Sequence, residues 1–342
     1  TIGQAEQSLE RFQENRESGE DLQNCVDYLN QLRGIFSLVE LRGGALLCQE
    51  AVSLSNEVPV GATDDKNNLL TALNNAIFTL RRYVEYYQRQ QTDRPELLLP
   101  VINEIREARH DSPYPDSCFF ETSLSASPDF CADLSLPPLE AEDDNDLEIH
   151  ARRFRLMYQV GLLGVIRNED MATSRRLLSR AARGFSRLCR GQELASLWCL
   201  VSIVSDVMEE KQLPAEKNRK RLFMKIERYA RELVQVGRVA MGKTAPHSVF
   251  RELVYILYRS GSQKPEVSRI LQAYDLTPAA FTEERMLEHR RHLYGPGADV
   301  LRSFSDAINE ELRELKDRLD IVERGIDPDT TELSTIAESL ER

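Results

Sequence analysis

Apolar residues recur three and four positions apart along most of the chain, which is the period of one face of an α-helix. The clearest early case runs through residues 22–39, at Leu22, Cys25, Val26, Leu29, Leu32, Phe36 and Val39. Similar patterns predict helices over residues 65–91 and 95–109, the second with Pro95 in its first turn. With two segments before Asn56 they make about four helices, which is enough for one helical bundle.

The same period resumes in the second half of the chain. It predicts helices over residues 147–166, 170–189, 193–213, 215–236, 248–259, 266–274 and 300–322. Glycine and proline residues separate several of these segments, as Gly261, Pro278 and Gly295 do. We therefore expect an all-α protein whose second helical domain is larger than its first.

Composition changes abruptly between His110 and Ala151. These 42 residues contain no Lys or Arg, five of the 14 prolines, and eleven Asp or Glu. So polar a stretch buries too little apolar area to offset its ordering entropy, which predicts an extended linker. Phe119, Phe120 and Phe130 could pin it against a bundle. The expected organisation is a first bundle over residues 1–109, the linker over 110–147, a second bundle over 148–322 and a helical extension over 323–342.

Several broad classes of protein are disfavoured by the sequence. The six cysteines (25, 48, 118, 131, 189 and 199) show no C-x-x-C spacing, and most lie in apolar helical patterns, which indicates reduced, buried thiols in a cytosolic protein. No run of 18 apolar residues and no basic-then-apolar start occurs, so we expect neither a membrane span nor a signal peptide. The chain opens without Met and ends in a helix-like pattern over residues 331–342, so we expect it to be part of something longer.

The formal net charge of −12 argues against a general binder of nucleic acid. Residues 110–151, however, contain eleven Asp or Glu and no Lys or Arg. The rest of the chain has 45 acidic and 44 basic residues. The predicted bundles are therefore nearly neutral, and an arginine-rich face on one of them could still bind an acidic surface.

One such face is predicted on the helix over residues 170–189. Its arginines step by four and three, and no acid lies between Asp170 and Glu193; they are Arg176, Arg180, Arg183, Arg187 and Arg190. This spacing predicts one exposed, unpaired stripe. Guanidinium groups suit carboxylate or phosphate partners. A solvated face and a docking face for the acidic linker or an acidic protein both remain open.

Two other patterns have the spacing of a phosphate site or a metal site, but the neighbouring sequence does not supply the rest of such a site. Gly237, followed by Gly242-Lys243-Thr244, has the spacing of a phosphate-binding P-loop, yet a charged helix leads in and Ala245-Pro246 leads out. We interpret it as a helix end followed by a turn, with nucleotide binding as an alternative. His289 and His292 are three apart beside Glu288 without a third ligand, so we expect neither a metal nor a cofactor.

Residues 30–50 resemble the helix pair of histidine phosphotransfer (Hpt) domains. In that family H-x-x-K-G holds the phospho-accepting imidazole on a four-helix bundle, and the glycine lets a receiver domain approach closely. Here Asn30 stands at the histidine position, Arg33 at the lysine position, and Gly34 is kept. An amide nitrogen is not a usable nucleophile, because its lone pair is delocalised into the carbonyl. The resemblance therefore implies a pseudo-Hpt domain that docks without relaying phosphate.

A closer resemblance is to FimL-type proteins and to the N-terminal section of ChpA, a multi-Hpt chemosensory kinase. The similar blocks are residues 31–50, 161–168, 249–256 and 310–320. The resemblance implies a second Hpt-like bundle in which Met157 to Gly161 replace the phosphotransfer pentad. It also implies a cytoplasmic, non-enzymatic adapter in type IV pilus (twitching) motility and cyclic-AMP control. Such an adapter would be recruited to the cell pole and linked to the adenylate cyclase pathway, and it could form homo-oligomers.

The partners implied by this resemblance are a receiver-domain response regulator or a polar scaffold protein. We expect docking on the face around Asn30, Arg33, Gly34 and Arg42, where the arginines can meet an acidic pocket. The arginine stripe at Arg176, Arg180, Arg183 and Arg187 is a competing location. An alternative function is active phosphotransfer through His150, which lies early in a helix beside Arg152 and Arg153.

Overall fold

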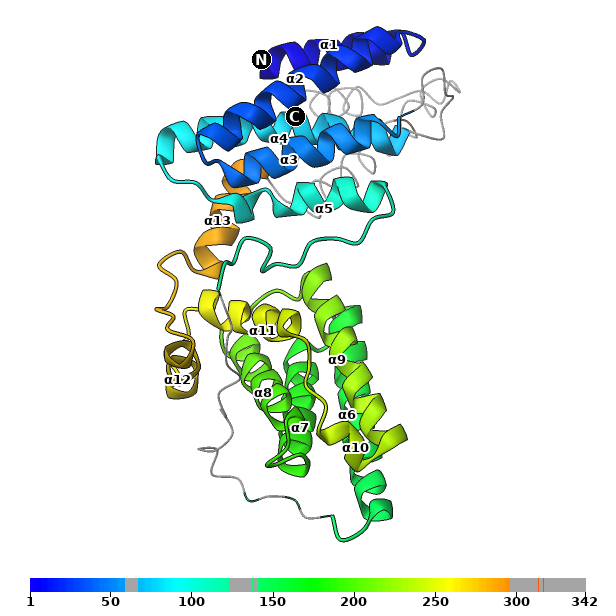
Figure 1. Ribbon diagram of the computed structural model, residues 1–342, viewed down its shortest axis with the longest axis vertical. Coiled ribbons are helices and arrows are strands. Elements are labelled where there is room, and N and C mark those ends of the chain that lie inside the picture. Colours follow the sequence, from blue (N-terminus) through cyan, green and yellow to red (C-terminus); the bar gives the residue numbers. More distant parts are fainter. Residues whose placement is uncertain are drawn as a thin grey trace, which may run out of the picture. The chain divides into compact units, whose positions relative to one another are not determined.

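The computed structural model describes residues 1–58, 67–122, 137, 139, 141–295, 313 and 316 (Figure 1). All regular elements among these residues are helical, which confirms the all-α prediction. Contacts divide the chain into a compact unit over residues 1–287 and a second over residues 288–342. The predicted helix over 300–322, apart from residues 313 and 316, lies outside the described residues, as do the predicted extension, Phe130 and Cys131.

The first half of the larger unit is built from five α-helices and a short 3-10 helix. They are α1 (Ile2–Glu14), α2 (Gly19–Leu38), α3 (Arg42–Ser55), α4 (Asn67–Gln90), η2 (Pro95–Leu97) and α5 (Leu99–Ala108). Helices α1 to α4 pack in sequence, α1 also contacts α4, and α5 packs on α3 and α4. Three helices precede Asn56 where two were predicted, because the chain turns between α1 and α2 and Glu40 adopts a left-handed φ of 59° after α2.

The second half contains the remaining described helices, except that the last of them continues past residue 287 into the smaller unit. They are α6 (Asp144–Arg167), α7 (Met171–Leu188), α8 (Leu194–Glu210), α9 (Lys217–Val236), α10 (Arg238–Met241), α11 (His247–Arg259), α12 (Pro265–Ala273) and α13 (Glu283–Tyr294). Helix α7 packs between α6 and α8, α9 lies on α6, and α11 packs on α8. Most residues of α8 are apolar and buried, so it forms the centre of this half.

Aromatic rings and close helix packing hold this second core together. Trp198 of α8 is fully buried and stacks on Phe185 of α7, with ring centroids 4.4 Å apart. Helices α6 and α7 approach so closely that a Cβ added to Gly161 would lie 2.7 Å from the carbonyl oxygen of Ser174. Glycine is therefore required where these two helices cross.

The cysteines mostly lie in the core, as their apolar setting predicted. Cys25, Cys48, Cys189 and Cys199 are buried, and Cys118 is half-buried. Burial raises the pKa of Cys25, Cys48 and Cys189 to about 12, so these thiols are core side chains and not nucleophiles. None of the helices in the described parts of the chain is both long and apolar enough to cross a membrane.

Candidate functional site

The face predicted for docking on the first half lies on the last turns of α2. Asn30 is half-buried, and its side-chain amide donates a hydrogen bond to the Val26 carbonyl 3.1 Å away. Arg33 and Gly34 are both exposed. The Asn30 amide is thus engaged within its own helix, and at the position of the Hpt histidine the helix offers no nucleophile.

Gly34 has open space around it. A Cβ added there would meet no atom within 4 Å, whereas one added to Gly43 would lie 2.7 Å from Pro95. Next to Gly34 the chain exposes aliphatic side chains at Ile35, Leu38 and Val39, and Leu38 is 85% exposed. Exposed aliphatic side chains beside an uncovered glycine form a surface that another protein could approach closely.

Arg42 begins α3, beyond the end of α2. Its guanidinium forms an ion pair with Glu121, which belongs to the predicted linker. Both side chains are largely exposed, so the pair contributes little to stability and leaves Arg42 free to exchange partners. The structure therefore places Asn30, Arg33 and Gly34 together on α2, and Arg42 on the following helix with an acid already bound.

The arginine stripe on α7 is not the unpaired row that the sequence predicted. Arg176 lies 3.4 Å from Glu209, and Arg183 pairs with Asp206, both acids being on α8. Arg187 donates to the Pro137 carbonyl at 2.9 Å, and its own carbonyl accepts from the Leu139 amide at 3.3 Å. Local sequence could not show the ion pairs, because both acids come from the next helix. Pro137, however, belongs to the predicted linker, which the sequence left open as one occupant of this face.

Arg180 is different from its neighbours. Within the described ranges it is exposed and forms no hydrogen bond or ion pair, while Arg190 has a partner. The stripe therefore offers one open guanidinium and several that would first have to leave their present partners.

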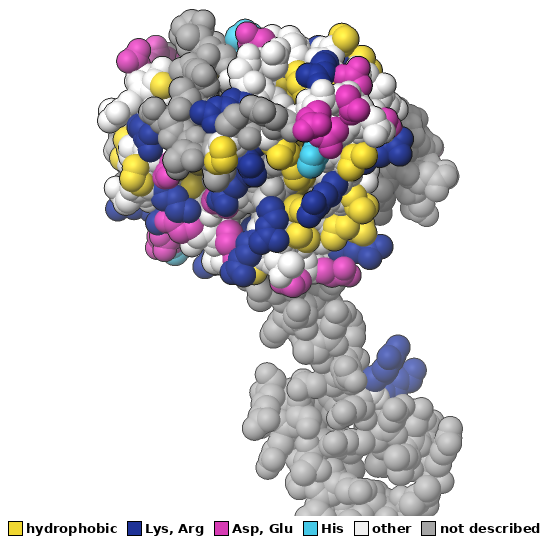
Figure 2. Space-filling model, turned by 90° about the horizontal axis from the view of Figure 1, so that it is seen from below, with side chains coloured by type: hydrophobic (Ala, Val, Ile, Leu, Met, Phe, Trp, Pro, Cys, Tyr) yellow, Lys and Arg dark blue, Asp and Glu magenta, His cyan; other side chains and the backbone are white. Residues whose placement is uncertain are grey.

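The pentad that the resemblance placed in the second half is used for packing. Tyr158 is fully buried, and its hydroxyl donates to the Phe223 carbonyl at 3.0 Å. Gly161 is covered by α7, so it gives no partner close access. The outward face of α6 instead exposes aliphatic side chains at Ile149, Leu156, Val160 and Leu163. On the face of the molecule in Figure 2, Lys and Arg side chains likewise lie among hydrophobic ones.

The remaining chemical candidates do not assemble a site. A long helix, α9, leads into Gly237 instead of a strand, and Lys243 forms an ion pair with Glu232 at 3.0 Å. The phosphate-cradling loop is therefore not formed. The His150 ring stacks on Phe154 and lies 3.5 Å from Asp146. Over the described parts of the chain, no three His, Cys, Asp or Glu side chains gather as a metal site, and this includes His289 and His292.

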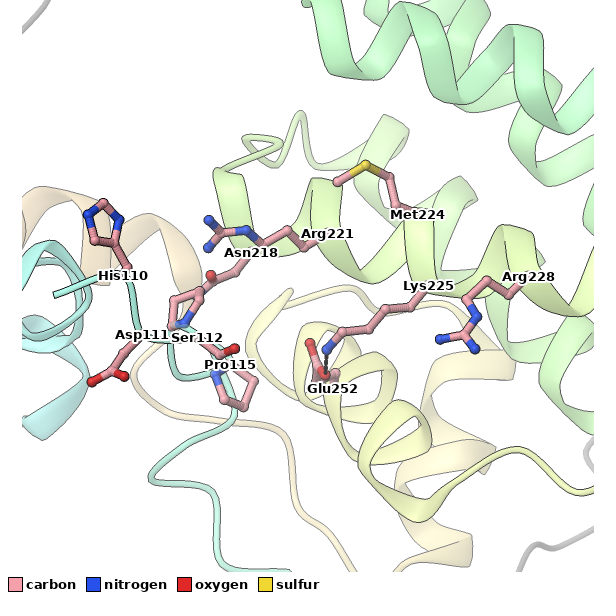
Figure 3. A pocket seen from close by; sticks show the side chains of 11 residues that line it. His110, Asp111, Ser112, Pro115, Asn218, Arg221, Met224, Lys225, Arg228 and Glu252 are labelled. Atoms are coloured by element: carbon pink, nitrogen blue, oxygen red, sulfur yellow. Dashed lines mark ion pairs between the residues drawn. The ribbon is translucent and has the colours of Figure 1, made fainter. Parts of the chain in front are cut away.

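Residues 110–122, the first part of the predicted linker, contact both halves of the larger unit. The Asn218 side chain of α9 donates to the Tyr114 carbonyl at 2.9 Å and to Asp116 at 2.8 Å. The Phe120 ring lies 5.3 Å from that of Tyr255 of α11. Figure 3 shows the beginning of this segment facing the basic side chains of α9 across an open pocket.

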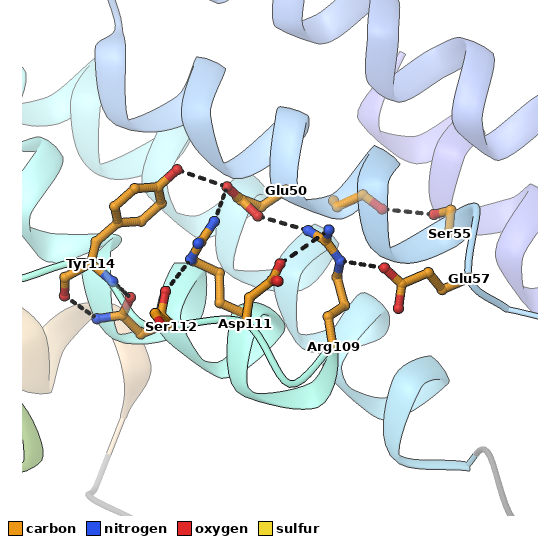
Figure 4. A network of polar contacts seen from close by, with 10 residues as sticks. Glu50, Ser55, Glu57, Arg109, Asp111, Ser112 and Tyr114 are labelled. Atoms are coloured by element: carbon orange, nitrogen blue, oxygen red, sulfur yellow. Dashed lines mark hydrogen bonds and ion pairs between the residues drawn. The ribbon is translucent and has the colours of Figure 1, made fainter.

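On its other side this segment is held by a buried carboxylate, Glu50 of α3 (Figure 4). Glu50 accepts from Arg106 at 2.8 Å, from Arg109 at 3.0 Å and from the Tyr114 hydroxyl at 3.0 Å. A buried carboxylate needs such partners, since an unpaired charge would be costly to bury. Sequence reasoning missed this network, although an acid inside the apolar pattern of α3 was a usable signal.

Direct ion pairs join the two halves beside this segment. Glu107 of α5 binds Lys217 at 3.0 Å and Arg221 at 3.1 Å, both from α9. Hydrogen bonding and charge attraction from these two bases hold the pKa of Glu107 below its ordinary value. A third pair, Glu96 with buried Arg259 at 3.3 Å, joins η2 to α11.

Two sequence comparisons show which known proteins this chain is similar to. Residues 143–286 match the family described as the FimL scaffold protein second domain. Over 331 residues the chain is 38% identical to "Scaffold protein FimL" of Pseudomonas aeruginosa. The match covers 95% of this chain and 57% of the relative, so the chain spans a little over half of that protein's length. No solved structure matches. Both matches are to FimL proteins, in agreement with the resemblance of its residues.

Proposed function

We propose that this protein is a non-catalytic scaffold that holds protein partners on the surfaces of its two helical halves. The observation that carries the proposal is the exposed patch at the end of α2, where Gly34 is uncovered and Leu38 is 85% exposed. The adjoining Asn30 amide is not a nucleophile. The name of the Pseudomonas aeruginosa relative supports the scaffold role. For the wider system we propose type IV pilus motility and cyclic-AMP control.

We propose that the partner at the α2 patch is a receiver-domain response regulator, with a polar scaffold protein as the other candidate. The patch has the two properties that such a partner requires, close backbone approach at Gly34 and a neighbouring cation at Arg33. Arg42 would contribute if its exposed pair with Glu121 opens. The four stripe arginines form a second candidate surface, at which Arg180 is the open group.

The docking proposal is tested by pull-down of the full chain with purified receiver domains of the pilus chemosensory pathway. Gly34→Trp covers the patch and should reduce capture at least tenfold. Asn24→Trp is the matched control, because Asn24 is also exposed on α2 but lies about 15 Å further along the helix. Capture by Gly34→Trp at the wild-type level would refute the assignment of the partner to this patch.

The non-catalytic part of the proposal has its own test. Incubation with a cognate histidine kinase and labelled ATP should leave no acid-labile phosphate on the chain. Acid-labile phosphate that appears on the wild-type chain but not on His150→Gln would favour the active phosphotransfer alternative instead.

A further inference from the structure

A cavity of about 630 Å³ lies between residues 110–115 and helices α9 and α11 (Figure 3). Its volume is within the range of small-molecule binding sites. It does not overlap the α2 patch or the α7 stripe, so docking of a partner protein does not account for it.

The α9 wall of this cavity is basic. Arg221, Lys225 and Arg228 line it at steps of four and three residues, which places them along one side of the helix. At a rise of 1.5 Å per residue, the backbone positions of Arg221 and Arg228 are about 10 Å apart along the helix axis. Met224 adds an apolar side chain to this wall. The opposite wall contains His110 and Ser112, together with Pro113 and Pro115.

The two acids of the cavity are already paired. Asp111 lies 3.1 Å from Arg109, outside the cavity, and Glu252 lies 3.6 Å from Lys225. Figure 4 shows Asp111 directed toward Arg109. The acids therefore do not neutralise the arginines of α9.

The two arginines differ in what they already bind. Arg228 is exposed and, in the described part of the chain, makes no hydrogen bond or ion pair. Arg221 is partly exposed and reaches Glu107 through Nη2, while its Nη1 is enclosed by the protein. A partly exposed ion pair is weak, so an anion in the cavity can compete with Glu107 for the Arg221 guanidinium.

We propose that this cavity binds a small organic anion that carries two phosphate or carboxylate groups. One acidic group is held by Arg228 and the other by Arg221 in place of Glu107, with Lys225 between them. The organic body lies against Met224 and the prolines 113 and 115. The site goes beyond the scaffold role, because it gives the protein a small-molecule input.

Binding at this site has a consequence for the contact between α5 and α9. Arg221 is shared between the cavity and Glu107, so the anion competes with Glu107 for the same guanidinium. Removal of the Glu107 charge should therefore strengthen anion binding, although Glu107 does not line the cavity.

The experiment is isothermal titration of the full chain with pyrophosphate and, separately, with citrate at 0.15 M salt. We expect saturable one-to-one binding, and the tighter probe identifies phosphate or carboxylate as the preferred group. Arg228→Ala should weaken binding at least tenfold, and Glu107→Gln should strengthen it several-fold. Arg231→Ala is the matched control, because Arg231 is exposed one turn further along α9, lies outside the cavity and pairs with Glu227.

Two results would overturn the proposal. One is the absence of saturable binding of either probe at concentrations on the order of 10 mM. The other is an equal loss in Arg228→Ala and Arg231→Ala, which would show screening by surface charge instead of a site. Circular dichroism of each variant confirms that the helices are intact, so that a loss of binding reports on the cavity.

Discussion

Glu50 shows how one buried side chain can organise a polar region. It is 3% exposed and receives hydrogen bonds from two arginines and a tyrosine, which come from α5 and from the segment that follows it. Its place in an apolar helical pattern was a sequence signal of a buried acid, but its partners could not be predicted, because Arg106, Arg109 and Tyr114 are more than 50 residues away. Candidate residues on one helix, such as Asn30 and Gly34, could be grouped by helical spacing alone.

We expect Glu50→Gln to lower the free energy of unfolding by about 2–4 kcal/mol, because the half-buried guanidinium groups of Arg106 and Arg109 lose the buried carboxylate that both of them bind. Urea denaturation of the full chain measures the loss. Glu57→Gln is the control, because Glu57 also binds Arg109, at 2.9 Å, but is half exposed. That change should cost less than about 1 kcal/mol. Equal effects of the two changes would contradict the role of Glu50.

At the scale of helices, periodicity predicted much of the second half. Helices α6 and α8 were placed to within three residues at each end. The earlier start of α6 has a local cause, since the Asp143 side chain accepts a hydrogen bond from the Asp146 amide at 2.7 Å and caps the helix. Periodicity could not show which apolar side chains stay exposed, so the outward aliphatic face of α6 was missed.

Two glycines in long helices should respond in opposite directions to the same substitution. Gly34→Ala meets open space in a helical backbone and should stabilise the protein by about 0.5–1 kcal/mol. Gly161→Ala places its Cβ against the Ser174 carbonyl and should destabilise it by about 1–3 kcal/mol. The denaturation midpoints of the two variants measure the difference. A Gly161→Ala midpoint at or above that of the wild type would show that α6 and α7 are not in close contact there.

For the whole molecule, the acidic composition of residues 110–151 predicted a linker, and the division at residues 109 and 148 stays a prediction. Residues 110–122 nevertheless contact helices from both halves, through polar groups such as Asp116 and the Tyr114 carbonyl and through the ring of Phe120. Composition measures how much apolar surface a segment can bury. It does not measure how many hydrogen bonds and ion pairs its neighbours can supply.

The contact between the halves should depend on pH through Glu107. Its pKa is lower in the folded protein than in the unfolded chain, so its stabilisation is fully present above the unfolded value of about 4.5 and is lost as pH falls through the folded value. We expect wild type to be more stable than Glu107→Gln at pH 5–7, with the difference vanishing toward pH 3. Thermal melts of both proteins across this range test it. A difference that grows on acidification would have the wrong sign.

The segment that begins at His110 also bears on how this protein can be divided and recombined. The family match starts at residue 143, yet α9 takes polar partners from Glu107, Tyr114 and Asp116, all upstream of that boundary. A fragment cut at residue 143 would thus expose cations that the intact chain neutralises. The unit that can be exchanged therefore extends upstream of the region that matches the family model. Gene fusions or chimeras that exchange the second half should therefore tolerate a junction at residue 109, which keeps Tyr114 and Asp116 with α9, better than one after Thr122.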